Sequence, residues 1–530
     1  MKTGYLSLIL HAHLPYVRHP EHDSFFEENW LFEAITECYI PLIGVLDRLL
    51  HDKIDYRLTL SLSPPLLTML RDELLQQRYL KYLHSRIELA EKEVVRTQKL
   101  AEFKPLAEYY LKFYQDTLAV YQDQYQGDII SAFKKHYDTG QLELITCAAT
   151  HGFLPLLNIS ETAVRNQIKI GVNTFKSHLG FAPTGIWLPE CAYYPGVEKL
   201  LAEAELKYFF MDTHGILDAK PAPINGVYAP INCGNGVHAF GRDPDSSKQV
   251  WSSQEGYPGD FDYREYYKDI GFDLDLDIIA PYLLDDNTRI NTGIKYYRVT
   301  GKDVEKQLYD PAIASAKAKQ HAADFINKRQ QQIAALTLTM DREPIIVAPY
   351  DAELFGHWWF EGPQWLEEVL RLASNTNQPL TTSACSDYLK QTSTAQIASP
   401  AASSWGDQGY YSYWLNDSNS WIYPYLHQAE AELEKLALDL KDLKVTSFQA
   451  RAANQAARSL LLAQASDWPF IMKAGTTTQY ANKRITDQLA RFNYLMDCIR
   501  KNRINERYLV ALETMDNIFP DINFRDYCPK

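Results

Sequence analysis

The sequence predicts an α/β fold in which a parallel sheet or barrel carries two helical additions. Seven short apolar runs are each followed by polar or turn-forming residues, as the strands of such a fold are. A stretch of long helical patterns separates the second run from the third. Helical patterns dominate again after a Ser/Ala/Thr-rich connector that begins near residue 395.

The apolar runs are the predicted strands of the sheet. They occupy residues 5–10, 56–63, 142–149, 184–189, 207–212, 236–240 and 344–350. Strands that alternate with helical stretches are typical of a parallel sheet or a β/α barrel. In such a barrel the functional groups gather where the strands end, on the carboxyl-terminal rim. The residues that directly follow these runs are therefore the first candidates for a functional site.

The two helical regions set the predicted domain boundaries. Residues 65–136 contain patterns such as "RDELLQQRYLKYLHSRIELAEKEVV" and are predicted to form an inserted helical domain. Residues 1–64 and 137–395 would then form one discontinuous barrel domain, and residues 396–530 a C-terminal helical domain.

Composition and charge exclude several classes of partner. The chain of 530 residues is 46% apolar and 23% charged, which is typical of a globular protein. Its net charge of −14, without a Lys/Arg-rich block, argues against nucleic acid as a partner. A neutral substrate is compatible with this charge, and the many Trp and Tyr residues, 10 and 35, suit the stacking of sugar faces on rings.

The cysteines and the N-terminus indicate a cytoplasmic protein. The seven Cys show no CxxC pair or regular spacing, so neither a disulfide framework nor a zinc finger is predicted. The start "MKTGYLSLILHAHLP" lacks the pattern of a signal peptide. Because no uninterrupted apolar run reaches about 18 residues, we expect no membrane span.

Polar residues follow the predicted strands at equivalent places. They are His11, His13, His151, Glu190, Asp212, His214, Asp243 and Asp351. Glu190 and Asp351 form the natural pair, because each ends a strongly apolar run and is followed by aromatic residues. Two carboxyl groups that face each other across a barrel mouth suit glycoside chemistry, one as acid and one as nucleophile or base. The alternative is two unrelated, salt-bridged carboxylates, and their spacing leaves both interpretations open.

The stretch His11-Ala-His13 also has two interpretations. Alternate residues of a strand point to the same side, so both imidazoles can face the barrel mouth. They would bind a metal, as in deacetylases built on related barrels, or hydrogen-bond to sugar hydroxyls. An HxH pair without a third ligand at motif spacing is a weak metal signal, so we predict no metal.

Five segments in order resemble the motifs of glycoside hydrolase family 57. They are "HAHLP" (11–15), "HGFLP" (151–155), "WLPECAYYPG" (187–196), "APYDAELFGHWWFEGPQWL" (348–366) and "SSWGDQGYYSYWLNDSNSWIYP" (403–424). Residues 239–273, "NTGIKYYRVTG" (291–301) and "ASDWPF" (465–470) resemble the 1,4-α-glucan branching enzymes of that family.

The resemblance implies an incomplete (β/α)7 barrel with an inserted helical domain and a C-terminal helical domain. It implies a retaining enzyme that cleaves an α-1,4 bond and transfers the chain to a 6-hydroxyl, with Glu190 as nucleophile and Asp351 as general acid/base. The implied substrate is an α-glucan such as amylose or glycogen, without metal or organic cofactor. The oligomeric state stays open.

The resemblance assigns substrate contacts to His11, His13, His151, Arg264, Trp405 and Trp414. Further substrate contacts are predicted for Trp30, Trp251, Asp467 and Trp468. Trp358, Trp359 and Trp365 are instead predicted to pack behind the strand that carries Asp351.

One segment departs from the branching enzymes. Their mobile loop over the cleft carries a Tyr that favours transfer over hydrolysis, but the corresponding residues 230–240 here, "PINCGNGVHAF", contain none. The glycines would still let this loop act as a lid. A family 57 α-amylase and a 4-α-glucanotransferase therefore remain alternatives. A metal-dependent carbohydrate deacetylase and a non-catalytic glucan-binding protein are weaker ones.

Overall fold

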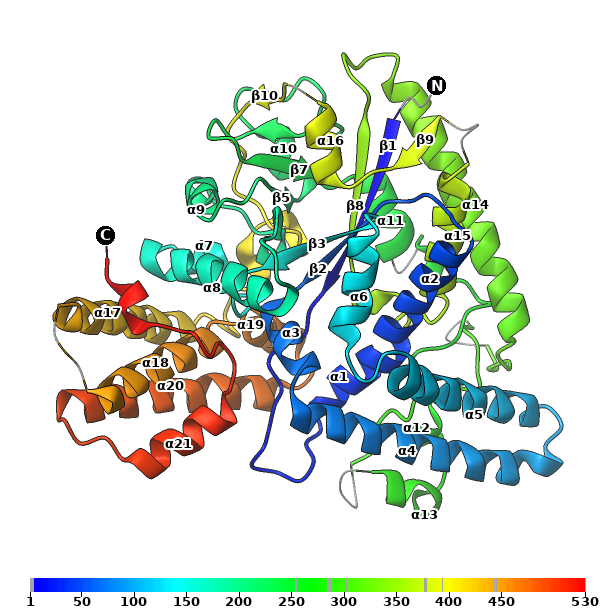
Figure 1. Cartoon of the computed structure of the whole chain (residues 1–530). Helices are drawn as coiled ribbons and strands as arrows, with labels where there is room; N and C mark the ends of the chain where they lie inside the picture. The colour runs from blue at the N-terminus through cyan, green and yellow to red at the C-terminus, as the bar shows by residue number, and fades with distance from the viewer. Residues whose placement is uncertain are drawn as a thin grey trace.

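The computed structural model describes residues 4–252, 255–283, 288–300, 304–375, 379–392, 394–442, 444 and 446–529. Seven parallel strands form the centre of the molecule (Figure 1). They are β1 (Gly4–Ala12), β2 (Leu58–Leu62), β3 (Leu142–Cys147), β4 (Gly185–Trp187), β5 (Tyr208–Met211), β7 (His238–Gly241) and β8 (Ile345–Asp351). All seven predicted strands are confirmed.

The strands lie in the order β7-β5-β4-β3-β2-β1-β8, so neighbours in the chain are mostly neighbours in the sheet. The sheet curls so that the chain after β7 reaches β8 at the other end of the strand order. There the backbone N–H of Asp243 donates to the carbonyl of Val347 in β8 at 2.8 Å. Among the described residues no strand ladder joins β7 to β8, which makes the barrel incomplete, as expected. Three short strands were not predicted: β6 (Ile231–Asn232), β9 (Leu380–Thr382) and β10 (Gln396–Ile397).

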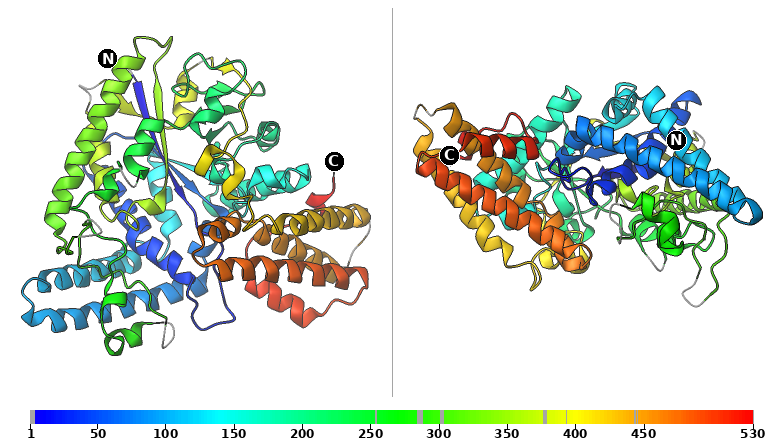
Figure 2. Two further views of the ribbon diagram at one scale, coloured as in Figure 1. Left: turned by 180° about the vertical axis from the view of Figure 1, so that it is seen from behind. Right: turned by 90° about the horizontal axis from the view of Figure 1, so that it is seen from below.

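Helices cover the outside of the curled sheet (Figures 1 and 2). They include α2 (Ile40–His51), α8 (Glu161–Leu179), α9 (Val197–Glu203), α11 (Pro244–Trp251), α14 (Pro311–Leu336), α15 (Gly362–Ala373) and α16 (Cys385–Gln391). Local sequence sets their limits: α8 begins where the Ser160 hydroxyl accepts from the Ala163 N–H and ends at Gly180, whose φ of 84° suits glycine. Shorter helices are α1 (Glu28–Ala34), α7 (Leu154–Leu157) and α10 (Thr213–Leu217).

Two helices of the predicted insertion, α3 (Pro64–Leu70) and α6 (Ile129–Asp138), pack against barrel elements. The other two, α4 (Glu73–Arg96) and α5 (Lys104–Ala119), form a projecting hairpin. A later segment with α12 (Ile270–Asp273) and α13 (Leu276–Ile279) packs against it, because the Tyr110 and Tyr114 hydroxyls donate to the carbonyls of Lys295 and Thr292 at 2.6 and 2.9 Å. This segment lies within the predicted barrel range, and the domain boundaries themselves stay predictions.

The C-terminal region is a helical bundle that packs against one side of the barrel (Figure 1). It contains α17 (Ile422–Leu440), α18 (Ser447–Ala463), α19 (Asp467–Ala474), α20 (Thr478–Arg500) and α21 (Glu506–Met515). The chain before α17 still follows the barrel, since β10 pairs with β6 and Ser403 pairs with Tyr193.

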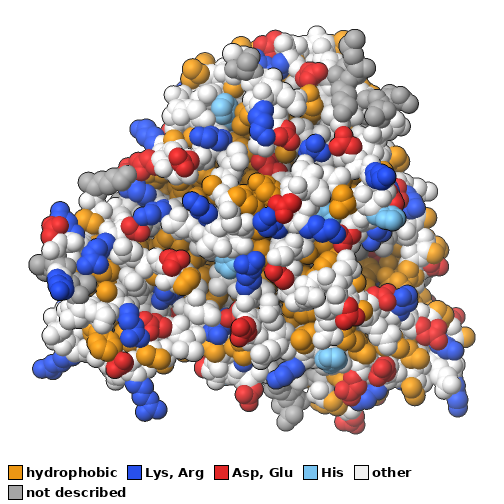
Figure 3. All heavy atoms as spheres, in the orientation of Figure 1, with side chains coloured by type: hydrophobic (Ala, Val, Ile, Leu, Met, Phe, Trp, Pro, Cys, Tyr) orange, Lys and Arg blue, Asp and Glu red, His pale blue; other side chains and the backbone are white. Residues whose placement is uncertain are grey.

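On the face shown in Figure 3, basic and acidic side chains are interspersed. Among the described residues, none of the helices combines the length and the apolar character needed to cross a bilayer.

Candidate active site

The carboxyl ends of the parallel strands bring the predicted site residues together. His11 of β1 lies in register with Ser61 of β2 on one side and with Asp351 of β8 on the other. Side chains at equivalent positions of neighbouring parallel strands point to the same face. His11 and Asp351 therefore stand side by side at the rim.

A pocket of about 820 Å³ opens at this rim. Nine residues predicted from the sequence line it: His11, His13, His151, Glu190, Trp251, Asp351, Trp405, Trp414 and Asp467. The same pocket is also lined by Leu14, Arg242, Glu353, Leu354, Trp358, Gly406, Asp407, Tyr413 and Phe470. The two candidate catalytic carboxyl groups thus share one cavity, surrounded by aromatic rings.

Glu190 is held on both carboxylate oxygens by the C-terminal part of the chain. The indole N–H of Trp405 donates to Oε2 at 2.8 Å, and the Ser466 hydroxyl donates to Oε1 at 3.2 Å. The backbone of Glu190 is left-handed, with φ of 61°, a conformation that is uncommon outside glycine and is often found at functional sites. Burial raises the pKa of Glu190 to about 7, while the donors from Trp405 and Ser466 act in the opposite direction and favour its charged form.

Asp351 has a different environment. Burial and neighbouring charges act on its carboxyl group, and among the described residues no hydrogen-bond donor contributes to its pKa. Burial, followed by the charges of Glu353 and Glu190, holds the pKa of Asp351 well above its ordinary value, and Arg242 opposes this shift only in part. The hydrogen-bond donors thus favour the charged form of Glu190, whereas the surroundings of Asp351 favour its protonated form, which is the division of roles that an acid and a nucleophile need.

A chain of hydrogen bonds connects the barrel strands to Glu190. His11 Nδ1 lies 3.0 Å from the Ser61 hydroxyl, and His11 Nε2 lies 3.0 Å from His151 Nε2. His151 Nδ1 lies 2.7 Å from the hydroxyl of Ser466, which donates to Glu190. Since the Ser466 hydroxyl gives its single proton to Glu190, it accepts from His151, which therefore carries its proton on Nδ1. His151 Nε2 is then an acceptor, and His11 donates to it from Nε2. Burial lowers the pKa of both imidazoles well below their ordinary range, so both are neutral.

The histidines could also be considered as a metal site. Within the described part of the chain, His11, His13 and His151 offer ring nitrogens that all lie within 4.8 Å of one another. Each of these nitrogens already has a protein partner, since His13 contacts Ser63 at 2.8 Å and Asp467 at 3.1 Å. The arrangement fits a network of hydrogen-bonded imidazoles, and we assign no metal to it.

The tryptophans divide into pocket and core. Trp251 is 40% exposed and its ring lies 6.2 Å from that of Trp405. Trp359 and Trp365 are buried, which confirms their predicted packing role. The same prediction was wrong for Trp358, which lines the pocket and is 51% exposed. Trp359, the next residue in the sequence, is buried in the core, because the turn after β8 directs the rings of Trp358 and Trp359 to different sides.

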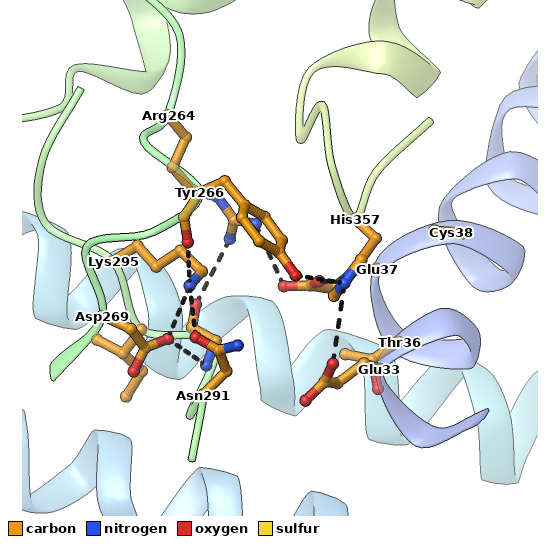
Figure 4. A network of polar contacts seen from close by, with 12 residues as sticks. Glu33, Thr36, Glu37, Cys38, Arg264, Tyr266, Asp269, Asn291, Lys295 and His357 are labelled. Atoms are coloured by element: carbon orange, nitrogen blue, oxygen red, sulfur yellow. Dashed lines mark hydrogen bonds and ion pairs between the residues drawn. The ribbon is translucent and has the colours of Figure 1, made fainter. Parts of the chain in front are cut away.

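Three predicted substrate contacts do not line the pocket. Arg264 is buried in a separate network, where its guanidinium lies 3.3 Å from Glu37 (Figure 4). The same guanidinium lies above the ring of Phe360. Trp468 is 1% exposed and donates its indole N–H to the carbonyl of Leu462. Trp30 packs edge-on against Tyr480. Their contacts with substrate stay predictions without support from this geometry.

Other residues of the site were missed from the sequence. Arg242 directly follows a predicted strand, and Glu353 stands two residues after Asp351, so position alone was a usable signal for both. Ser466 precedes Asp467 in a quoted motif, but its contact with Glu190 joins residues 276 positions apart in the chain. No local pattern predicts such a contact.

Residues 230–240, suggested as a lid, lie at the edge of the sheet. These residues form a tight hairpin in which Ile231 and Asn232 pair with Ala239 and His238. β10 adds to the outer edge of this hairpin. Of the described pocket-lining residues none comes from the hairpin, because its backbone is committed to the edge of the sheet.

This fold and site define a class: carbohydrate-active enzymes that work with a pair of carboxyl groups on a barrel rim. A family description, "Glycosyl hydrolase family 57", matches residues 7–401, and a second, "1,4-alpha-glucan branching enzyme, C-terminal", matches residues 425–527. The chain belongs to glycosyl hydrolase family 57.

Similar proteins carry two different names. The alpha-amylase AmyC of Thermotoga maritima is 44% identical, with a TM-score of 0.93, and the match covers 100% of this chain and 99% of that one. A family 57 branching enzyme of Pyrococcus horikoshii is 32% identical, with a TM-score of 0.89, over 100% and 97% of the two chains. A 1,4-alpha-glucan branching enzyme of Thermococcus kodakarensis is 34% identical over 97% of this chain and 77% of its own length.

Proposed function

We propose that this protein is a retaining 1,4-α-glucan branching enzyme. One observation carries the proposal: the region that matches the branching-enzyme C-terminal family supplies Ser466, which donates to the candidate nucleophile Glu190. The region that matches the branching enzymes therefore includes a residue that contacts a candidate catalytic group.

The environments of the two carboxyl groups support a two-step reaction. Glu190 attacks the anomeric carbon of an α-1,4-linked glucosyl unit, and protonated Asp351 gives its proton to the departing 4-oxygen. The C1–O4 bond breaks and an ester between C1 and a Glu190 oxygen forms. Asp351 then takes the proton from an incoming 6-hydroxyl, whose oxygen displaces Glu190. The product is an α-1,6 branch with the original anomeric configuration.

Linkage analysis of the products tests this function. Purified protein is incubated with amylose, and α-1,6 linkages are quantified from their anomeric proton signals and from the chains released by a debranching enzyme. We expect new α-1,6 linkages with few new reducing ends, and none with the Glu190→Gln variant. An increase in reducing ends without any α-1,6 linkage would reject the proposal.

A specific observation favours a second candidate, an α-amylase. AmyC of Thermotoga maritima shares 44% identity with this chain, and residues 230–240 form a hairpin outside the pocket instead of a Tyr-bearing lid. A pocket without such a lid is more open to water, which competes with the acceptor hydroxyl. The ratio of α-1,6 linkages to reducing ends in the same experiment separates the two candidates.

A further inference from the structure

Two stacked aromatic rings form an exposed ledge beside the catalytic pair. The ring centres of Tyr266 and Trp358 lie 4.2 Å apart at an angle of 28°. Trp358 lines the pocket while 51% of it remains exposed. A large indole left open to water at the edge of a cavity offers a flat apolar face to a ligand.

The ring beneath Trp358 is fixed from several sides. The Tyr266 hydroxyl lies 3.1 Å from Nε2 of His357. The backbone carbonyl of Tyr266 accepts from Nζ of Lys295 at 2.7 Å. Lys295 also forms an ion pair with Asp269 at 3.0 Å. Figure 4 shows Tyr266 between these groups, with its hydroxyl directed toward His357. The ledge is therefore rigid before any ligand arrives, which reduces the entropy lost on binding.

His357 connects the ledge to the body of the barrel. Its Nδ1 lies 2.6 Å from Glu37, and Glu37 also pairs with Arg264 at 3.3 Å. The pKa of His357 is raised, against the effect of burial, mainly by its hydrogen bond to Glu37. A charged His357 donates to Glu37 and to the Tyr266 oxygen at once. It is a positioning residue, because it acts on the ledge through Tyr266.

The place of the ledge in the chain indicates which part of a substrate it meets. Asp351 is the last residue of β8 and Trp358 lies in the segment that follows it, and Leu354 between them also lines the pocket. Trp405, by contrast, contacts Glu190. Since the general acid/base takes the proton from the incoming hydroxyl, an acceptor enters on the side of Asp351.

We propose that Trp358, stacked on Tyr266 and positioned through His357, binds the acceptor α-glucan chain. This inference rests on the proposed transfer function and adds the surface that receives the second sugar chain. The apolar face of a glucosyl ring would lie on the indole of Trp358, and its 6-hydroxyl would face Asp351.

The ratio of transfer to hydrolysis tests the ledge. Trp358→Ala is compared with Trp358→Phe and with the control Trp421→Ala. Trp421 is also exposed, with 41% of its surface open to water, but it does not line the pocket. We expect Trp358→Ala to lower the number of α-1,6 linkages per reducing end about tenfold, the size of one lost aromatic contact. Trp358→Phe should recover most of this ratio, and Trp421→Ala should match the parent.

The positioning residue gives a second readout. His357→Gln keeps a polar side chain but loses the charge, so we expect a higher acceptor concentration for half-maximal transfer and little change in the maximal transfer rate. Equal loss of transfer and hydrolysis in Trp358→Ala would place the ring on the donor side and overturn the inference. An unchanged ratio would overturn it as well.

A binding measurement separates this inference from the branching proposal. If the parent protein forms no α-1,6 linkages, branching is rejected, and maltoheptaose binding is then measured by calorimetry in the Glu190→Gln background. Weaker binding after Trp358→Ala, but not after Trp421→Ala, would keep the ledge as a glucan-binding surface. Equal binding by the Glu190→Gln protein and by its Trp358→Ala and Trp421→Ala derivatives would reject the ledge as a glucan-binding surface.

Discussion

Two pairs of buried carboxyl groups, Glu190 with Asp351 and Glu37 with Asp269, have pKa values shifted in opposite directions. In the catalytic pocket, burial raises the pKa of both Glu190 and Asp351, and Arg242 opposes this shift at Asp351 only in part. In the network of Figure 4, Glu37 pairs with Arg264 and His357, and Asp269 pairs with Lys295. There the cations and N–H donors lower both carboxyl pKa values despite burial.

The difference separates charges that hold the fold from charges available for chemistry. A buried carboxylate with a cation at hydrogen-bond distance is stable in its charged form and has no reason to exchange protons. A buried carboxyl group without one is poised near neutrality, where it can give or take a proton. Arg264, predicted from the sequence as a substrate contact, pairs with Glu37 and is therefore one of the charges that hold the fold.

The largest expected effect is on catalysis in the pocket. Glu190→Gln should abolish turnover, and Asp351→Asn should lower kcat by about 10²–10⁴-fold, the usual contribution of a general acid/base. Neither change should lower Tm at pH 8, because Glu190→Gln removes a buried charge and Asp351→Asn replaces a protonated carboxyl group by an uncharged amide of similar size. Chain-end assays and calorimetry measure the two effects. A large fall in Tm with either variant would mean that these carboxylates are structural.

The second effect is on stability in the network. Arg264→Met leaves Glu37 without its guanidinium partner, so we expect a loss of about 3–5 kcal/mol in the free energy of unfolding. Denaturant titration measures this loss. Arg264→Lys serves as the matched control, since it keeps the charge but not the planar geometry. If Arg264→Met were as stable as the parent but bound glucan poorly, the sequence-based assignment would be right.

A smaller effect is expected at the contact between the bundle and the nucleophile. Ser466→Ala removes a donor that stabilises charged Glu190, so the pKa of Glu190 should rise further above 7. The acidic limb of the kcat/KM profile then moves to higher pH, and kcat/KM near neutrality falls about tenfold, as for one lost hydrogen bond to a charged group. The control is Ser404→Ala, whose buried hydroxyl has no described partner. An unchanged acidic limb would remove Ser466 from this role.

The smallest effect tests whether a raised pKa alone marks function. Glu430 is buried in α17 with Gln464 as its donor, and burial raises its pKa from 4.5 to about 8. Between these values the unfolded chain is ionised there and the folded chain is not, so unfolding becomes easier as pH rises from 5 to 8. Glu430→Gln should flatten that pH dependence without changing activity. Lost activity would mean that the bundle takes part in the reaction.

The sequence predicted the barrel better than the contacts around it. The strands were found because each combines a continuous apolar run with a special residue at its end, as in "GIWLPE". The site residues on strand ends followed from the same rule. Ser466 could not be predicted, because its role depends on how the bundle packs on the barrel. Trp358 was misassigned because the direction of a side chain within a turn is not encoded in local hydrophobicity.

The contacts of Glu190 with Trp405 and Ser466 have a consequence for synthesis. A ribosome completes the barrel strands long before it reaches α19, so a growing chain holds its nucleophile without the two donors. We therefore expect a chain that ends before residue 405 to cleave α-glucan poorly, because its Glu190 lacks both the Trp405 and the Ser466 donor.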